Sequence, residues 1–413
     1  MHILLIHQYY QEKDDPGGMR WNAMTKLWAA EGHQITVIAG MTNYASGIKH
    51  PRYTNKYTYS EQFDTNIRVI RTHVSKSYNK SFRGRLNAYF SFVFSGIYGG
   101  LFKARDKYDL ILVSSPPLSV GIIALTLAFF KRRPFALEIR DLWPESAIDT
   151  GVLTNSTMIK WSYRLEALLY RKALVTNVVT PAMQEVLINN KKVPANKVIY
   201  IPNAADFDMS DVLLLNFDTA ELRETLQLNG KLSLCYVGAH GVANHLEQLI
   251  IAAEKLRDLP VMFVFIGDGM QKQVLIEMVT ARNLKNVTFI GLITKSEALK
   301  YILACDIGLS VLKKADTFKT VYSNKTFDYM ACKKPVIMAI DGVSRKLIED
   351  ADAGIYVEPE NTDEMIKAIS TYLQHPELIK SHGENGYAYV KQHFDRKTLA
   401  QQYIRELTGR CSK

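Results

Sequence analysis

The chain has 413 residues, of which 47% are hydrophobic and 22% are charged, as in an ordinary soluble protein with ample core. This length predicts two domains. The four cysteines are scattered without a C-x-x-C pair, which argues against a zinc site or a disulfide framework and favours a reducing compartment. No secretory signal is expected at the start, because residues 2–7 already have a strand-like pattern.

The net charge of +10 is unevenly distributed. Residues 1–200 carry +12 and the remainder carries −2, so the first half is expected to face an anionic surface. Nucleic acid is disfavoured as that surface, because the basic residues do not follow a helix-turn-helix, RRM-like or zinc-finger pattern. An anionic membrane is the better match.

The chain opens with a strand, a loop, a helix and a second strand. Ile3–Ile6 and Ile35–Ala39 are the apolar runs, and a helix is expected over residues 19–30. This order is typical of a doubly wound domain, which binds ligands at the carboxyl ends of its strands. Gly17 and Gly18 in the loop would let a phosphate or sugar approach the backbone, although a simple turn explains them equally well. The loop is not a G-x-G-x-x-G fingerprint, so NAD chemistry is disfavoured.

Residues 66–105 combine eight basic residues with eight aromatic residues and no acidic one. Residues 86–102 are uncharged and lie between cations, which favours a helix at an anionic membrane surface over an ordinary core helix beside a basic loop. Residues 110–130 are also uncharged, but Pro116 and Pro117 divide them into a strand and a helix, both too short to span a membrane. A peripheral protein is therefore predicted. The expected membrane and acceptor face consists of Arg83, Arg85, Tyr89, Phe90, Phe94, Lys103 and Arg105.

Arg140 and Asp141 follow the apolar strand Phe135–Ile139. Catalytic groups of doubly wound sheets lie at such strand ends, so both are candidates, the alternative being a salt bridge that closes a loop. The last strand of this half is Lys197–Ile201. The first domain is therefore predicted to span residues 1–202, followed by a linker rich in turn-forming residues.

The second half repeats the alternation of strands and helices, and a second domain is predicted over residues 207–390. Three successive strands run directly into Gly238, Gly267 and Gly291. Glycine after each strand is expected to keep the carboxyl edge of the sheet open, as a bound nucleotide requires. Residues 391–413 are predicted to form a helix that crosses back to the first domain.

The most informative stretch is residues 316–335, between two apolar strands. Ser323 or Asn324 can cap a helix whose first turn carries Lys325, and the free N–H groups of a first turn attract anions. Lys319 adds a second positive charge. Asp328, one turn further on, could accept hydrogen bonds from sugar hydroxyls. The helix end, the two lysines and Asp328 together have the features of a nucleotide-sugar site. The alternative is an ordinary surface pair of Lys325 and Asp328.

Two segments of the chain, D-L-W-P-E-S and S-N-K-T-F-D-Y-M-A-C-K-K-P-V-I, together with the two doubly wound halves, resemble glycosyltransferase family 4. The WbuB-like enzymes of bacterial surface-polysaccharide assembly are the most similar branch. The resemblance implies an α/β GT-B fold, with two Rossmann-like domains facing a cleft. It also implies a retaining transferase that moves a sugar, such as an N-acetylated or deoxy amino sugar, from a UDP-sugar to a polyprenyl-diphosphate-linked saccharide in capsule or O-antigen synthesis. Such an enzyme would work on the inner face of the cell membrane.

The resemblance also assigns roles to individual residues. Asp328 matches the second acidic position of the family's E-x7-E motif and would hold the ribose, while Lys325 and Lys319 would lie near the diphosphate. Arg140 and Asp141 fall where the family has a pair beside the donor sugar and acceptor. The remaining donor-binding positions are Gly17, Gly18, Gly238, His240, Gly267, Asp268, Gly291, Leu292, Thr320, Ser323 and Asn324.

The sequence departs from the family pattern at several points. Thr320 replaces the first acid of E-x7-E, and Ala239 and Asn244 replace the Arg and Lys that many members carry after this strand. His240 could substitute for them, but a solvent-facing histidine is expected. The implied mechanism uses Lys325 and the helix end to stabilise the leaving diphosphate, with Asp141 or that phosphate as base, and needs no metal or other cofactor.

Two other functions stay open. One is a nucleotide-sugar epimerase or hydrolase on the same fold, which the basic, aromatic first half does not favour. The other is a catalytically inactive, membrane-associated binding subunit, with which Thr320 is consistent.

Overall fold

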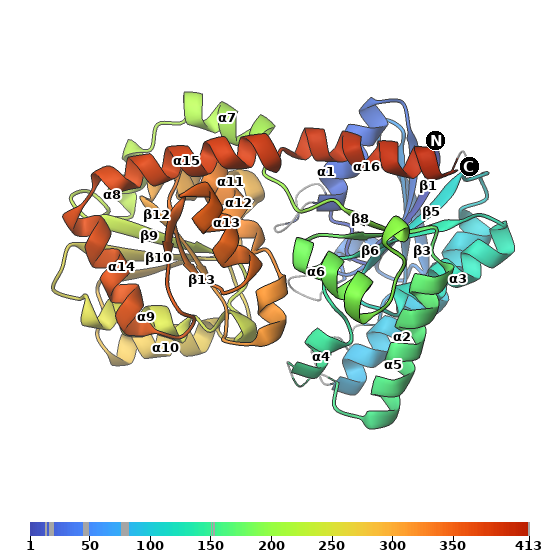
Figure 1. Cartoon of the computed structure of the whole chain (residues 1–413), viewed down its shortest axis with the longest axis horizontal. Helices are drawn as coiled ribbons and strands as arrows, with labels where there is room; N and C mark the ends of the chain where they lie inside the picture. The colour runs from blue at the N-terminus through green and yellow to red at the C-terminus, as the bar shows by residue number, and fades with distance from the viewer. Residues whose placement is uncertain are drawn as a thin grey trace. The chain divides into compact units, whose positions relative to one another are not determined.

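The computed structural model describes the chain except for residues 13, 14, 16–19, 44–48, 76–81, 150, 152, 412 and 413. The side chains of residues 82, 83 and 85 are likewise outside the description, and with them the predicted roles of Gly17, Gly18, Arg83 and Arg85. The chain divides into two compact units (Figure 1). The first comprises Met1–Asp15, Met19–Pro202 and Lys397–Lys413, and the second includes Asn203–Arg396.

The first unit is built on an eight-stranded sheet with the order β3-β4-β2-β1-β5-β6-β7-β8. All neighbouring strands are parallel except β3 and β4. The strands are β1 (His2–Ile6), β2 (Gln34–Gly40), β3 (Thr58–Asp64), β4 (Ile67–Thr72), β5 (Leu110–Ser115), β6 (Phe135–Ile139), β7 (Val175–Val178) and β8 (Val198–Tyr200).

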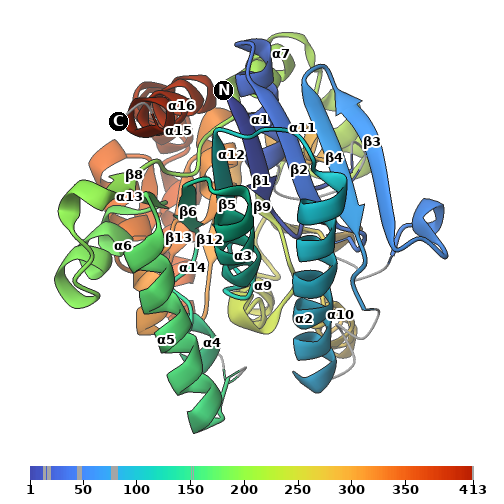
Figure 2. The same ribbon diagram turned by 90° about the vertical axis from the view of Figure 1, so that its right-hand side faces the viewer.

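Helices cover this sheet on both faces. The neighbouring helices α2, α3 and α5 lie along one face, with α3 between the other two (Figure 2). The helices of the unit are α1 (Arg20–Ala30), α2 (Phe82–Tyr98), which runs into the π-helical turn η2 (Gly99–Lys103), α3 (Val120–Lys131), α4 (Glu145–Asp149), α5 (Ser156–Lys172), α6 (Pro181–Glu185) and α16 (Arg396–Cys411).

The C-terminal helix α16 packs on the first helix of the chain. Trp28 on α1 donates its indole N–H to the carbonyl oxygen of Ala400 at 2.8 Å. Tyr403 lies between Trp21 and Trp28, with ring centroids 6.2 and 5.6 Å away. These large buried rings attach Lys397–Lys413 to the first unit.

The second unit has a six-stranded, all-parallel sheet with the order β11-β10-β9-β12-β13-β14. Its strands are β9 (Leu232–Val237), β10 (Val261–Ile266), β11 (Val287–Ile290), β12 (Ile307–Val311), β13 (Val336–Ala339) and β14 (Gly354–Tyr356). The strand order reverses direction at the pair β9 and β12, and the crevice at such a switch point is where doubly wound domains bind ligands.

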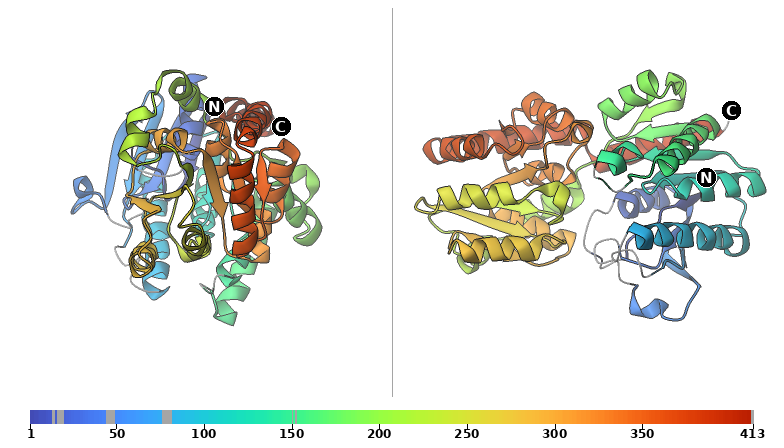
Figure 3. Two further views of the ribbon diagram at one scale, coloured as in Figure 1. Left: turned by 90° about the vertical axis from the view of Figure 1, so that its left-hand side faces the viewer. Right: turned by 90° about the horizontal axis from the view of Figure 1, so that it is seen from below.

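The helices of the second unit cover both faces of its sheet (Figure 3). One hydrophobic core joins the sheet to α9 (Glu247–Lys255), α10 (Lys272–Ala281) and α14 (Thr362–Gln374). The opposite core joins it to α7 (Phe207–Asn216), α11 (Lys295–Ala304), α12 (Asn324–Ala331), α13 (Val343–Ala351) and α15 (Glu377–His393), and α8 (Ala220–Thr225) packs at its edge. The predicted doubly wound architecture of both halves is confirmed.

The stretch around Pro116 and Pro117 forms a strand followed by a helix, as predicted, because the prolines interrupt the hydrogen-bonding pattern of either element. Among the described residues, no helix is long and apolar enough to cross a membrane. Three strands, β3, β4 and β14, were not among the predicted elements. The edge strand β3, T-Y-S-E-Q-F-D, is polar and lacks a continuous apolar run, two arginines interrupt the apolar run of β4, and β14 has only three residues.

Candidate active site

Helix α12 is attached to the sheet of the second unit at the switch point between β9 and β12. The hydroxyl of Tyr329 accepts the N–H of Val237 at 2.9 Å and donates to the carbonyl of Leu309 at 3.2 Å, so it bridges both strands. A side chain at Gly308 would collide with the Tyr329 ring, since an ideal Cβ there lies 2.2 Å from it. Glycine at position 308 therefore makes room for the residue that positions the helix.

The first turn of α12 brings Lys325 to the loop that follows β9. Its ammonium donates to the Tyr236 hydroxyl at 3.3 Å and lies 4.4 Å from the centre of that ring. The Tyr236 hydroxyl in turn donates a hydrogen bond to the carbonyl oxygen of Ala239 at 2.9 Å. Gly238 lies directly beside this lysine, because an ideal Cβ there would be 3.1 Å from Lys325 Cε. The structure thus places Lys325 and Gly238 together, at the carboxyl edge of the sheet.

Burial lowers the pKa of Lys325 to about 8. Ser323 occupies the N-cap position, but its hydroxyl makes no capping hydrogen bond. The helix end therefore combines the partly desolvated Lys325 ammonium with backbone N–H groups to which the Ser323 hydroxyl makes no hydrogen bond. That combination favours an anion, and a bound phosphate would raise the pKa of Lys325.

Asp328 lies one turn further along α12 and forms an ion pair with Lys295, the first residue of α11. About a sixth of the Asp328 side chain is exposed, 16% against 20% for Lys295. Lys295 was not predicted as a site residue, because the pair joins two helices that are separated in the chain. A carboxylate held in this way keeps lone pairs for hydroxyl donors, although the lysine competes for them.

The other predicted residues of this stretch either have partners of their own or are exposed. Lys319 is half-exposed and pairs with Asp316 at 2.9 Å and with Asp341 at 3.8 Å. Thr320 donates its hydroxyl to the carbonyl of Thr317 at 2.9 Å, and Asn324 is exposed. The positive charge of Lys319 is thus already compensated by acidic neighbours, unlike that of Lys325.

The expectation of a solvent-facing His240 is wrong, because the side chain is fully buried. Its ring lies among Tyr236, Phe265 and Phe289, with centroids 6.0 to 6.3 Å away. Burial, reinforced by the charges of nearby lysines, lowers the pKa of His240 to about 4. The imidazole is therefore neutral at physiological pH and does not replace the missing arginine as a cation. Neither ring nitrogen has a hydrogen-bond partner among the described residues.

Gly267 and Gly269, both in the loop after β10, serve close packing against the loop after β9. The loop after β10 lies against the loop after β9, where the N–H of His240 donates to the carbonyl of Asp268 at 2.8 Å. An ideal Cβ at Gly267 would lie 2.1 Å from the Gly238 carbonyl oxygen, and one at Gly269 would lie 2.4 Å from the His240 carbonyl oxygen. Only Gly291, with no atom within 4 Å of its ideal Cβ, leaves the open space that was expected of all three. Asp268 and Leu292 are exposed beside these glycines.

Replacing Gly267 with alanine is expected to lower the free energy of unfolding by about 2–3 kcal/mol, because φ is +133° and the new Cβ overlaps the backbone. Gly291→Ala is the matched control and should change it by less than about 0.5 kcal/mol. Urea denaturation of the full chain measures both. Equal stability of the two variants would contradict this account of the loops.

Asp141 follows β6 in the first unit and is partly buried. Ser146 donates its hydroxyl to the Asp141 carboxylate at 2.9 Å. Burial raises the pKa of Asp141, and the Ser146 hydrogen bond opposes that rise. A carboxyl group with a raised pKa at the carboxyl edge of a parallel sheet is suited to accept a proton.

His7 was not predicted, although it directly follows β1 and is buried at the same edge of the sheet. The charges of Arg140 and Arg71 add to the effect of burial, and the pKa of His7 lies well below its usual value. Its Nδ1 has no hydrogen-bond partner among the described residues. A histidine at the end of a strand could have been noticed in the sequence, but only the fold brings it near Arg140.

The described residues of the predicted membrane face lie on α2 and η2, except Arg105, which follows η2. The exposed fractions of Phe90, Phe94, Tyr98 and Phe102 are 42%, 68%, 38% and 53%. These residues recur every fourth position and so form one stripe along the outer side of the helix. Tyr89 is only partly buried and lies beside the stripe.

The fold defines a class of protein, the glycosyltransferases with a GT-B fold. Sucrose-phosphate synthase from Thermosynechococcus elongatus superposes with a TM-score of 0.75 at 18% identity, covering 99% of each chain. The Anabaena protein HepE, solved in complex with UDP and glucose, superposes with a TM-score of 0.72 at 19% identity, covering 99% of this chain and 100% of its own.

The amino-acid sequence matches the same class in both halves. Residues 17–204 match the model of the glycosyl transferase 4-like domain, and residues 218–389 match that of glycosyl transferases group 1. The chain belongs to glycosyltransferase family 4. The putative colanic acid biosynthesis glycosyl transferase WcaI of Escherichia coli is 25% identical over 99% of this chain and all of its own.

A second relative is the Campylobacter jejuni enzyme named as an N-acetylgalactosaminyltransferase acting on a diphospho-undecaprenol-linked saccharide. It is 25% identical over 59% of this chain and 63% of its own length.

Proposed function

We propose that this glycosyltransferase transfers a sugar from a UDP-sugar to a polyprenyl-diphosphate-linked saccharide, with retention of anomeric configuration, in the assembly of a bacterial surface polysaccharide. The observation that carries the donor assignment is the Lys325 ammonium, held beside Gly238 at the start of α12. In the proposed reaction this cation and the first-turn N–H groups stabilise the charge that develops on the leaving diphosphate. The acceptor hydroxyl loses its proton to Asp141 or to the departing phosphate. No metal is required in this mechanism, because lysines and the helix end supply the positive charge that a metal cation would otherwise provide.

Two relatives support the partners of this reaction. HepE was crystallised with UDP-glucose, and the Campylobacter enzyme is named for a diphospho-undecaprenol-linked acceptor. The absence of an acid at Thr320 leaves the contact to the donor sugar to other groups, and the name of the Campylobacter enzyme favours testing N-acetylated sugars first.

The experiment that tests the proposal has two stages. A panel of nucleotides and nucleotide sugars is screened by thermal shift, in which a bound donor raises the unfolding midpoint by mass action. Radiolabelled forms of the protective donors are then incubated with lipid extract. Transfer of label into lipid supports the proposal, release of free sugar would favour a hydrolase, and UDP binding without turnover would favour a binding subunit.

We also propose that the α2 stripe contacts the inner face of the cell membrane. Phe94 and Phe102 supply apolar area, and Lys103 and Arg105 follow directly with positive charge. Two neighbouring phenylalanines at the end of α3, Phe129 and Phe130, are exposed by 76% and 62%. Lys131 connects the ends of these helices, since it donates to the Ala104 carbonyl at 2.6 Å.

Neutralising Lys103 and Arg105 together is expected to weaken binding to vesicles that contain anionic lipid by about 30-fold, at about 1 kcal/mol for each charge near the surface. The control replaces Lys367 and Lys380, exposed lysines of α14 and α15 in the second unit. Vesicle co-sedimentation measures both double variants, and UDP protection should be unchanged in each. Equal losses in the two variants would contradict this assignment of the membrane face.

A further inference from the structure

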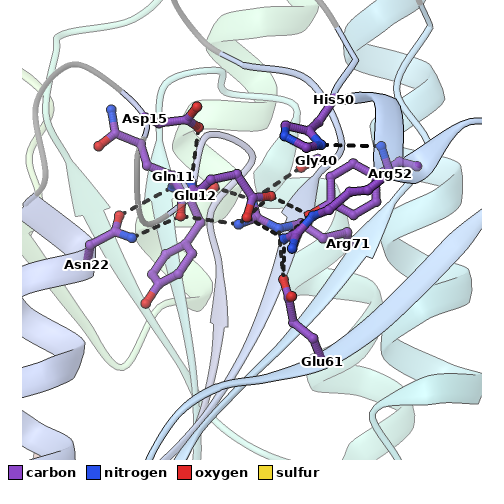
Figure 4. Close-up of polar contacts among 11 residues, drawn as sticks. Gln11, Glu12, Asp15, Asn22, Gly40, His50, Arg52, Glu61 and Arg71 are labelled. Atoms are coloured by element: carbon purple, nitrogen blue, oxygen red, sulfur yellow. Dashed lines mark hydrogen bonds and ion pairs between the residues drawn. The ribbon is translucent and has the colours of Figure 1, made fainter. Parts of the chain in front are cut away.

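The first unit contains a pocket of about 250 Å³ that the proposed chemistry does not use. Its described lining comes from the loop after β1 (residues 9–12 and 15), the end of β2 and the loop after it (40–43), residues 49–51 and 53, and the buried Arg71 of β4 (Figure 4). These segments leave the sheet at its carboxyl edge, where doubly wound domains bind ligands.

Arg71 forms the rigid base of the pocket. Only 2% of the residue is exposed, and its guanidinium donates to the carbonyl oxygens of Tyr10 and Gln11. It also forms an ion pair with Glu12 at 3.1 Å. Because the backbone carbonyls and the carboxylate hold it from several sides, Arg71 fixes the loop after β1 in one position.

Glu12 presents a fixed carboxylate to the pocket. It accepts hydrogen bonds from the Tyr53 hydroxyl and from Arg52, in addition to its pairing with Arg71. Arg52 is itself held by Glu61 at 2.8 Å. The side chain of Glu12 remains 16% exposed, so the oriented carboxylate can still accept a hydrogen bond from a ligand hydroxyl.

The lining selects a neutral, hydroxyl-rich ligand of one ring. Its charges balance, with Glu12 and Asp15 against Lys49 and Arg71, so it lacks the excess positive charge that a diphosphate needs. Tyrosines supply ring faces and hydroxyl groups. The volume is below the roughly 300–1,000 Å³ of sites for drug-sized ligands, which favours a single sugar ring over a nucleotide sugar.

The pocket is set back from Asp141. The sheet order places β2 and β1 under the pocket, with β5 between β1 and the strand β6 that carries Asp141 at its end. At about 4.8 Å between neighbouring strands, the pocket lies roughly 10–14 Å from that carboxylate. A ring bound there is therefore not the ring whose hydroxyl would react beside Asp141.

We propose that this pocket holds one sugar ring of the acceptor saccharide, removed from the reacting hydroxyl, and so selects acceptors by their internal sugar. This inference rests on the proposed function for the existence of a saccharide acceptor. The pocket itself is defined by the first unit alone.

The test is ligand-observed saturation-transfer NMR on the full chain with five free sugars, glucose, galactose, fucose, N-acetylglucosamine and N-acetylgalactosamine. At least one should bind, and saturating UDP should not displace it. Glu12→Gln and Tyr53→Phe are each expected to weaken that binding at least tenfold, because they remove the ligand's acceptor or the hydroxyl that orients it. Tyr59→Phe, a tyrosine of β3 outside the lining, is the matched control and should bind normally.

Glu12→Gln removes the charged partner of Arg52 and Arg71 and so can destabilise the fold, whereas Tyr53→Phe keeps the aromatic ring. The thermal unfolding midpoint of each variant shows whether it is folded. Absence of binding by all five sugars, displacement by UDP, or binding that survives both substitutions would overturn the pocket assignment. UDP protection of the wild-type chain is measured in parallel. Loss of that protection alone would refute the proposed function while leaving the pocket intact.

Discussion

Replacing Lys325 with methionine is expected to lower kcat/KM for the sugar donor by about 10²–10³-fold, the usual effect of removing one electrostatic contact to a developing charge. Methionine keeps the length of the side chain beside Gly238 and removes only the ammonium. Lys319→Met is the matched control. It should change kcat/KM by less than about threefold, because Lys319 is half-exposed and already paired with Asp316.

The pKa of Lys325 gives the same prediction a pH dependence. At about 8, it lies below the ordinary value because burial disfavours the charged form. Raising the pH through this value removes the proton from the free enzyme, so UDP affinity should fall as the pH rises from 7 to 9. Titration calorimetry should show this fall in the wild type and a flat profile in Lys325→Met. Parallel profiles in both proteins would contradict the role of Lys325.

Replacing Asp141 with asparagine is expected to lower kcat by about 10²–10⁴-fold and to leave UDP protection unchanged, because asparagine keeps the shape of the side chain but cannot accept the proton. Burial raises the pKa of Asp141, and the ionised form is the active base. Activity should therefore be lost on acidification at a higher pH than for an ordinary aspartate. An activity near that of the wild type would assign proton removal to the departing phosphate instead.

Ser146 allows a finer test of the same residue. Its hydroxyl donates to the Asp141 carboxylate and so stabilises the ionised form. Ser146→Ala should move the acidic limb of the pH–rate profile to higher pH, and a general loss of folding would not cause such a shift. An unchanged limb would show that Asp141 is not the titrating base.

The fold could be predicted from the sequence because most of the buried strands are short apolar runs followed by turn residues. Parallel strands are buried on both faces, so they have this composition regardless of their order in the sheet. The edge strand β3 lacks it and was missed, as were β4, whose apolar run contains two arginines, and the three-residue strand β14. Strand order itself depends on contacts between distant segments, which no local pattern contains.

The candidate site was predicted in part. Lys325 could be identified because the helix start, the charge and the position between two strands all lie within one stretch. The partner of Asp328 could not, since Lys295 is 33 positions earlier and meets it only through helix packing. The burial of His240 likewise depends on the rings of Phe265 and Phe289, which belong to neighbouring strands.

The glycines after the strands show how one pattern can have different causes. Gly267 and Gly269 are needed because the loop after β10 lies on the backbone of the loop after β9. Gly238 instead gives room to Lys325, and Gly291 faces open space. The sequence shows where a glycine lies, but not whether backbone, another side chain or solvent occupies the space beside its Cα.

A crystal structure of the chain with UDP would show whether the start of α12 receives the donor's diphosphate. We expect a diphosphate oxygen within hydrogen-bond distance of Lys325 Nζ, with the backbone N–H groups of the first helical turn facing the same group. A UDP molecule bound with its diphosphate beyond the reach of both Lys325 and that turn would contradict the claim.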